Sequence, residues 1–155
     1  MSSSNTPSQT PVPGRIPADS LQTALAAEHA MIWVLELATA FVSDKLTAAI
    51  AEGQTAHRAR RDATERLLRG DGARPLPAEP AYATPPVVDQ ASAVAVLIAA
   101  ETDLTETWRA VIERTDDSGL RKVALDALTD SAVRAARWRV AAAAGQLTVA
   151  LPGQP

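Results

Sequence analysis

The placement of proline divides this 155-residue chain more firmly than any other feature of its sequence. Of the 11 prolines, four precede Ala18, five lie between Pro75 and Pro86, and two lie at the C-terminal end. A proline inside a helix costs about 3 kcal/mol, because it lacks an N–H donor and its ring clashes with the preceding turn. Two long proline-free segments, 19–74 and 87–151, are therefore free to be helical.

Alanine dominates the apolar residues of the chain. There are 33 alanines and five aromatic residues, in a sequence that is 46% hydrophobic. Alanine is the strongest helix former, whereas β-sheets favour branched and aromatic side chains. The composition therefore predicts an all-α fold.

Each proline-free segment contains one break. Ser43-Asp44 is a good helix N-cap pair, and Asp116-Asp117-Ser118-Gly119 is a typical turn sequence. Gly70 and Gly145 stand where helices commonly end. We therefore predict four helices, over 20–42, 44–69, 88–115 and 118–145.

The connections between these helices predict their arrangement. Both intra-segment turns are short, so each pair of helices forms an antiparallel hairpin. The middle connection, 70–87, is proline-rich and could run the length of a 25-residue helix, about 38 Å. Two antiparallel helical hairpins joined by a long Pro-rich crossover form a ferritin-like four-helix bundle, which is the fold we predict.

Both ends of the chain are expected to lie outside the bundle. Residues 1–18 and 147–155 are rich in proline and polar residues, and bury too little apolar surface to offset the entropy lost on ordering. We therefore predict disordered tails around a bundle over 19–146. Because neither a signal-peptide h-region nor a membrane-spanning stretch occurs, we expect a cytoplasmic protein without a membrane partner.

Charge and cysteine content exclude several classes of function. Fifteen basic and 18 acidic residues leave a net charge of -3, which argues against nucleic acid as a partner. The arginines of 58–69 face all sides of their helix and alternate with acidic residues, so we expect them to be solvated. The absence of cysteine excludes disulfides, iron–sulfur clusters and cysteine nucleophiles.

An internal repeat relates the two halves of the chain. Leu25-Ala-Ala-Glu28 recurs as Ile98-Ala-Ala-Glu101 at an offset of 73 residues, and the same offset relates Arg61 to Arg134. It also relates His57 to Asp130. The two hairpins are therefore interpreted as divergent copies of one unit.

Apolar residues at spacings of three and four define one inward-facing stripe on each helix. Each stripe includes polar residues near its middle. We therefore predict a buried polar layer at the centre of the bundle, made of Glu28, His57, Arg61, Glu101 and Arg134.

A buried charged layer must be compensated by ion pairs or by a metal. The ferritin-like di-metal site takes one glutamate from each of two helices and Glu-x-x-His from each of the other two. Glu28 and Glu101 match the single glutamates, but Gln54-x-x-His57 and Ser131-x-x-Arg134 lack both bridging carboxylates. Iron and manganese need anionic oxygen ligands, so we expect no cofactor.

Ion pairs explain the layer without a metal. Arg61 and Arg134 would balance the charges of Glu28 and Glu101, and arginine can bind a carboxylate through two hydrogen bonds. The sequence leaves open which arginine contacts which glutamate.

Three segments carry a family resemblance: Leu25-Ala-Ala-Glu-His29, His57-Arg-Ala-Arg-Arg-Asp62 and Ala136-Arg-Trp138. Over residues 20–145 the chain resembles the ferritin-like domain proteins of unknown function found in actinobacteria. The resemblance implies a ferritin-like fold and lineage, and it implies no particular substrate.

We predict a non-catalytic bundle with a degenerate di-metal site, acting as a binding or assembly module. No nucleophile at a meaningful spacing accompanies His57, so nothing supports catalysis. One alternative is an iron or manganese oxidase or storage protein with an atypical site of Glu28, His57, Glu101 and Asp130. Another is a small-ligand-binding bundle that uses the same layer. The expected partners are a second copy of the chain, through a tryptophan at the interface, or an unidentified protein or small molecule.

Overall fold

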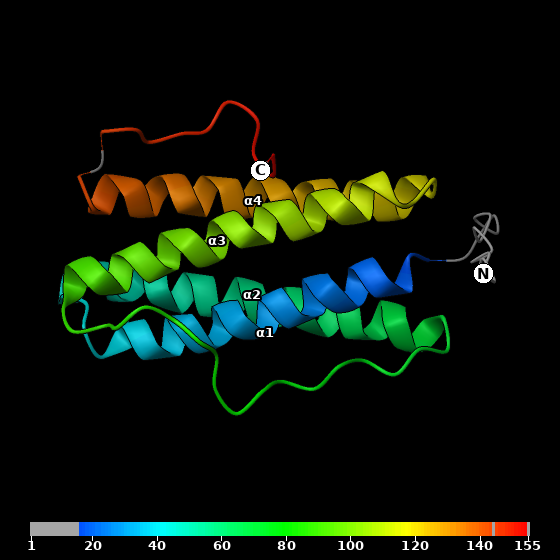
Figure 1. The fold of residues 1–155 in the computed structure, drawn as a ribbon, viewed down its shortest axis with the longest axis horizontal. Coiled ribbons are helices and arrows are strands. Elements are labelled where there is room, and N and C mark those ends of the chain that lie inside the picture. Colours follow the sequence, from blue (N-terminus) through cyan, green and yellow to red (C-terminus); the bar gives the residue numbers. More distant parts are fainter. Residues whose placement is uncertain (1–15, 144, 155) are drawn as a thin grey trace, which may run out of the picture.

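Four helices account for most of the residues described, which are 16–143 and 145–154 of a computed structural model (Figure 1). They are α1 (Ala18–Thr39), α2 (Asp44–Gly70), α3 (Gln90–Glu113) and α4 (Ser118–Ala141). No strand occurs within these ranges, which confirms the all-α prediction. None of the four helices is long and apolar enough to cross a membrane.

Aspartates cap the helices of the second hairpin. Asp89 Oδ1 accepts a hydrogen bond from the backbone N–H of Ser92 at 2.8 Å, and Ser92 Oγ accepts one from the N–H of Asp89 at 3.0 Å. Asp117 Oδ1 accepts the N–H of Leu120 at 2.6 Å. These bonds satisfy N–H groups that have no partner inside the helix, and they fix where α3 and α4 begin.

Two expectations about helix ends need correction. The Ser43 side chain forms no cap bond, and the Ser43 N–H instead donates to Gln90 Oε1 at 2.7 Å, which joins the first turn to the start of α3. Helix α4 ends at Ala141, before Gly145, because Ala143 adopts a left-handed conformation with φ of 52°.

The helices form two antiparallel hairpins, α1–α2 and α3–α4 (Figure 1). Helix α1 packs against both α2 and α3, and α3 packs against α4. Residues 71–89, here called the connecting segment, run back from the end of α2 to the opposite end of the bundle, so α2 and α3 are parallel (Figure 1). The backbones of α2 and α4 approach less closely, and long side chains bridge them.

The connecting segment is held against α1. Gln22 Nε2 donates to the Arg74 carbonyl at 2.7 Å, and its Oε1 accepts the Leu76 N–H at 2.9 Å. Further along, the rings of Trp33 and Tyr82 are 6.1 Å apart. These contacts fix the segment despite its lack of regular secondary structure.

The core follows the predicted stripes. Leu21, Leu25, Leu35, Leu97 and Leu104 are fully buried. Close packing between α1 and α2 depends on Gly53, where a Cβ atom would lie 3.1 Å from Leu35 Cδ2. The polar layer interrupts this apolar core near the middle of each helix.

Residues 145–154, here called the C-terminal segment, run back along α4 (Figure 1). Arg109 Nη1 donates to the Gly153 carbonyl at 3.1 Å, which connects the segment to α3. Gly153 has φ of 85°, and a Cβ there would lie 2.7 Å from the Thr105 carbonyl oxygen. The sequence predicts a disordered tail over 147–155, whereas glycine lets the backbone here contact α3. Most of the other predicted tail, 1–18, lies outside the described residues.

Candidate functional site

Three ionisable side chains meet in the centre of the bundle, and each is completely buried: Glu28 from α1, His57 from α2 and Glu101 from α3. His57 Nδ1 lies 2.8 Å from Glu28 Oε2, and His57 Nε2 lies 3.1 Å from Glu101 Oε1. One imidazole ring therefore joins carboxylates from two different hairpins. These three residues are here called the central cluster.

The central cluster favours a protonated His57. Both ring nitrogens face carboxylate oxygens, which only accept hydrogen bonds when ionised, and only the imidazolium has two N–H donors. Burial by itself would lower the pKa of His57, but hydrogen bonds to Glu101 and Glu28, together with their charges, raise this pKa above its ordinary 6.5. The two carboxylates therefore favour the protonated form of His57.

Both oxygens of Glu28 have donors. Oε2 faces His57, while Oε1 accepts from the Trp108 indole N–H at 2.8 Å and from Arg60 Nη1 at 3.4 Å. Arg60 Nη1 also donates to Ser131 Oγ at 3.2 Å, and Nη2 donates to Asp130 Oδ2 at 3.2 Å. The cluster is thereby connected to α4, and the charges of His57 and Arg60 balance those of the two glutamates.

Glu101 has a different environment from Glu28. Its Oε1 faces His57, but its buried Oε2 has no hydrogen-bond partner among the described residues. The two glutamates occupy equivalent positions in the internal repeat, yet only one of them is fully hydrogen-bonded. The centre is therefore asymmetric.

Comparison with known proteins shows the family. Residues 20–155 match the Domain of unknown function (DUF4439). The chain belongs to the DUF4439 family. Its structure is similar to that of a conserved hypothetical protein from Mycobacterium tuberculosis, with 33% sequence identity, a TM-score of 0.79, and coverage of 86% of this chain and 95% of that chain. No curated protein matches it. The membership confirms that the chain belongs to a family of unknown function.

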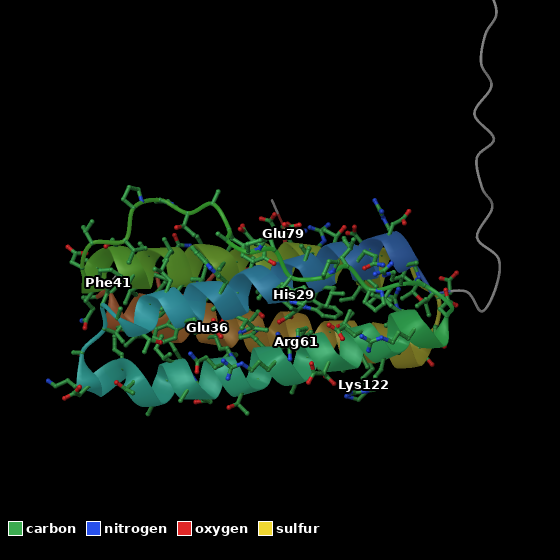
Figure 2. All side chains as sticks on the ribbon, turned by 90° about the horizontal axis from the view of Figure 1, so that it is seen from below. His29, Glu36, Phe41, Arg61, Glu79 and Lys122 are labelled. Atoms are coloured by element: carbon green, nitrogen blue, oxygen red, sulfur yellow. The ribbon has the colours of Figure 1, made fainter. Side chains whose placement is uncertain are left out.

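The structure brings together Glu28, His57 and Glu101 of this DUF4439 chain but does not bring Arg61 or Arg134 to them. Arg61 Nη2 lies 2.7 Å from Asp62 Oδ1, and its side chain is 29% exposed; Figure 2 labels Arg61 on α2. Arg134 Nη1 lies 3.2 Å from Glu52 Oε1, near the surface, and its buried Nε has no partner in the described ranges. The predicted ion pairs of these arginines with the glutamates are corrected accordingly.

The hydrogen bonds around Glu28 are completed by residues other than Arg61 and Arg134, namely Arg60, Trp108 and Ser131. Arg60 lies three residues after His57, and Arg61 lies four after it, so the two flank the same stripe from opposite sides. Arg60 is the one that turns toward α4 and Ser131. Trp108 lies seven residues after Glu101, which places both on one face of the helix, and a buried indole N–H requires an acceptor.

The side chains of the central cluster are directed at one another. A metal ligand needs a free nitrogen lone pair, whereas both nitrogens of His57 are directed at carboxylates. Asp130, the fourth ligand of the alternative site, has a side chain that is 63% exposed and pairs with Arg60. Within 16–143 and 145–154, no three histidine or acidic side chains are grouped to hold a metal ion.

His29 lies apart from the central cluster. It is buried beneath the connecting segment, where its Nε2 lies 3.2 Å from the Leu76 carbonyl oxygen. Figure 2 labels His29 on α1 and Glu79 on the segment that passes over it. His29 therefore helps to hold the connecting segment.

Proposed function

We propose that this DUF4439 protein is a non-catalytic binding module built on a ferritin-like bundle, in which the central cluster replaces the di-metal centre. The parallel arrangement of α2 and α3, joined by a long connection, is the topology of ferritin-like bundles. Glu28 and Glu101 stand at the single-glutamate positions of a di-metal site, and His57 stands at one histidine position. Ser131 and Arg134 occupy the positions of the second Glu-x-x-His.

The proposal rests on the hydrogen bonding of His57, in which each ring nitrogen faces a different glutamate. Both nitrogens are engaged by carboxylates, so neither is available to a substrate or a metal while these two hydrogen bonds are in place. The cluster is also fully buried, and none of the three surface cavities described in this chain is lined by its residues. The cluster therefore lies apart from these three cavities.

One observation favours the metal-binding alternative. Glu101 Oε2 is a buried carboxylate oxygen without a donor, which is the kind of atom that an iron or manganese ion would bind. Such a site would require His57 to release a proton and Asp130 to turn inward. It would depend on Glu101 and His57 together.

Elemental analysis distinguishes the binding module without metal from the metal-binding alternative. The full chain, purified without chelator and then offered Fe(II), Mn(II) or Zn(II), is expected to retain well under one equivalent of metal and to show no ferroxidase activity. Glu101→Gln serves as the matched variant, because it removes one carboxylate and keeps the shape of the side chain. Stoichiometric iron or manganese in the natural chain that is lost in Glu101→Gln would establish the metal-binding reading.

Two of the three tryptophans are not accessible for the expected homodimer interface. Trp108 and Trp138 are buried, and Trp33 packs against Tyr82 of the connecting segment. A binding surface for this module must therefore be sought elsewhere on the bundle, away from both the tryptophans and the central cluster.

A further inference from the structure

The outer face of α4 is apolar over most of its length. Leu125, Val133 and Val140 are 54%, 45% and 61% exposed, and their spacing places them on one side of the helix. The small residues Ala132 and Ala136 lie between them on the same side. The C-terminal segment passes over this face and leaves a cavity of about 340 Å³ between itself, α3 and α4.

The lining of this cavity has a single charged side chain, Arg139. The other lining residues are mainly alanine, valine, leucine and threonine. Arg139 is partly buried, and its Nη2 donates to Thr102 Oγ1 at 3.3 Å, which directs the guanidinium across the gap to α3. No carboxylate of the described ranges lies within 4.0 Å of it. The cavity therefore combines apolar walls with one cation that has no acidic partner among residues 16–143 and 145–154.

Gly153 fixes the C-terminal segment as a wall of the cavity. The Arg109 bond to its carbonyl and its close approach to Thr105 hold the backbone against α3. Any larger side chain at this position would meet the Thr105 carbonyl and would also be strained at φ of 85°. The cavity thus depends on one glycine in a segment whose other residues include Leu147, Val149 and Leu151.

We propose that this cavity binds a small amphiphile with one carboxylate and an aliphatic or aromatic body. Arginine binds carboxylates through charge-assisted hydrogen bonds, and the apolar walls match the body of such a molecule. Small-molecule sites have volumes of about 300–1,000 Å³ and combine apolar walls with a few polar groups. The proposal rests on the proposed function and names the ligand class of the binding module. It uses no residue of the central cluster. The result of the metal assay therefore does not determine the result of the ligand assay.

Titration calorimetry with octanoate on the full chain tests this proposal, with octanamide as the neutral molecule of the same shape. We expect saturable one-to-one binding of octanoate. Arg139→Gln should weaken octanoate binding about tenfold or more and leave octanamide binding unchanged, because only the carboxylate uses the charge. Ala136→Phe should abolish the binding of both molecules by filling the cavity.

A glycine pair tests the role of the C-terminal segment. Gly153→Val should displace the segment and weaken octanoate binding, whereas Gly145→Val, whose Cβ meets no atom within 4 Å, should leave it unchanged. If Ala136→Phe fails to fold, the Arg139→Gln variant and the comparison of Gly153→Val with Gly145→Val still test the proposal. Absence of saturable octanoate binding, or unchanged binding in Arg139→Gln, would overturn the proposal. A concentration-dependent dimer that excludes octanoate would also overturn it, because a second copy of the chain would then occupy this face.

Discussion

The indole N–H of Trp108 donates to Glu28 Oε1 at 2.8 Å, and both side chains are completely buried. The bond joins α1 to α3 and therefore joins the two hairpins. It also makes Glu28 the fully hydrogen-bonded member of a pair of glutamates, since Glu101 has one oxygen without a partner in the described part of the chain. Two equivalent positions of the repeat thus have different chemistry, and substitutions should reveal the difference.

Glu28→Gln is expected to destabilise the fold by about 1–3 kcal/mol, because an amide NH₂ would replace one of two oxygens that both face donors. Glu101→Gln should cost about 1 kcal/mol or less, because its amide oxygen can face His57 and its NH₂ can take the place of the unpartnered oxygen. Urea unfolding followed by circular dichroism measures both. Equal costs for the two variants would contradict the asymmetry of the centre.

The free energy of unfolding should decrease as the pH rises above 6.5. Burial opposes the charged form of His57, but the hydrogen bonds to Glu101 and Glu28 outweigh it and raise the pKa in the folded chain above the ordinary value of 6.5. Below 6.5 both states hold the proton, so the stabilisation is fully present. Between 6.5 and the higher folded pKa, the unfolded chain loses the proton first and the stabilisation is lost.

Urea unfolding from about pH 6 to pH 9 measures this dependence. His57→Gln is the control, because it retains His29 and every other titratable group. The decrease should be absent or much smaller in that variant. The same slope in both proteins would show that His57 does not titrate as its surroundings indicate.

Arg60→Met should destabilise the fold by about 1–3 kcal/mol, because it removes a cation that contacts Glu28, Ser131 and Asp130. Arg61→Met is the matched control on the next residue, where the arginine contacts the half-exposed Asp62. Its cost should stay below about 1 kcal/mol. Thermal and urea unfolding measure the free energies of unfolding of both variants. A larger cost for Arg61→Met would show that Arg61, and not Arg60, belongs to the buried polar layer.

Gly53→Val should destabilise the fold by about 1–3 kcal/mol, because its methyl groups would overlap Leu35 on α1. Ala51→Val, on the exposed side of the same helix, should cost about 0.5 kcal/mol from helix propensity. The difference between the two free energies of unfolding isolates the close contact of α1 with α2. If the two costs are the same, the close contact at Gly53 is not needed.

Local sequence signals were sufficient for the helices and for the middle of the bundle. Proline delimits the two helical segments, and the breaks at Ser43-Asp44 and 116–119 divide each of them, so the four helices could be placed within a few residues. The spacing of apolar residues put Glu28, His57 and Glu101 on inner faces, and all three are buried. These predictions depend only on neighbours along one helix.

Local sequence signals do not determine which side chains contact each other across different helices. The assignment of Arg60 to the centre depends on Ser131, 71 residues away, and on Asp62, which binds Arg61. The contact of Gly153 with Thr105 likewise depends on a backbone conformation that no periodic pattern encodes. Both features depend on partners that are distant in the sequence, which local patterns do not encode.

The sharing of His57 between the hairpins has a consequence for cooperativity. With α1 and α2 alone, His57 would lack the Glu101 acceptor, and Glu28 would lack the Trp108 donor. With α3 and α4 alone, Glu101 would be an anion without any donor. Either hairpin alone would also expose its apolar inner face to water, so we expect neither half to be a stable intermediate. The chain should therefore unfold in a single all-or-none transition, although it is built from two similar hairpins.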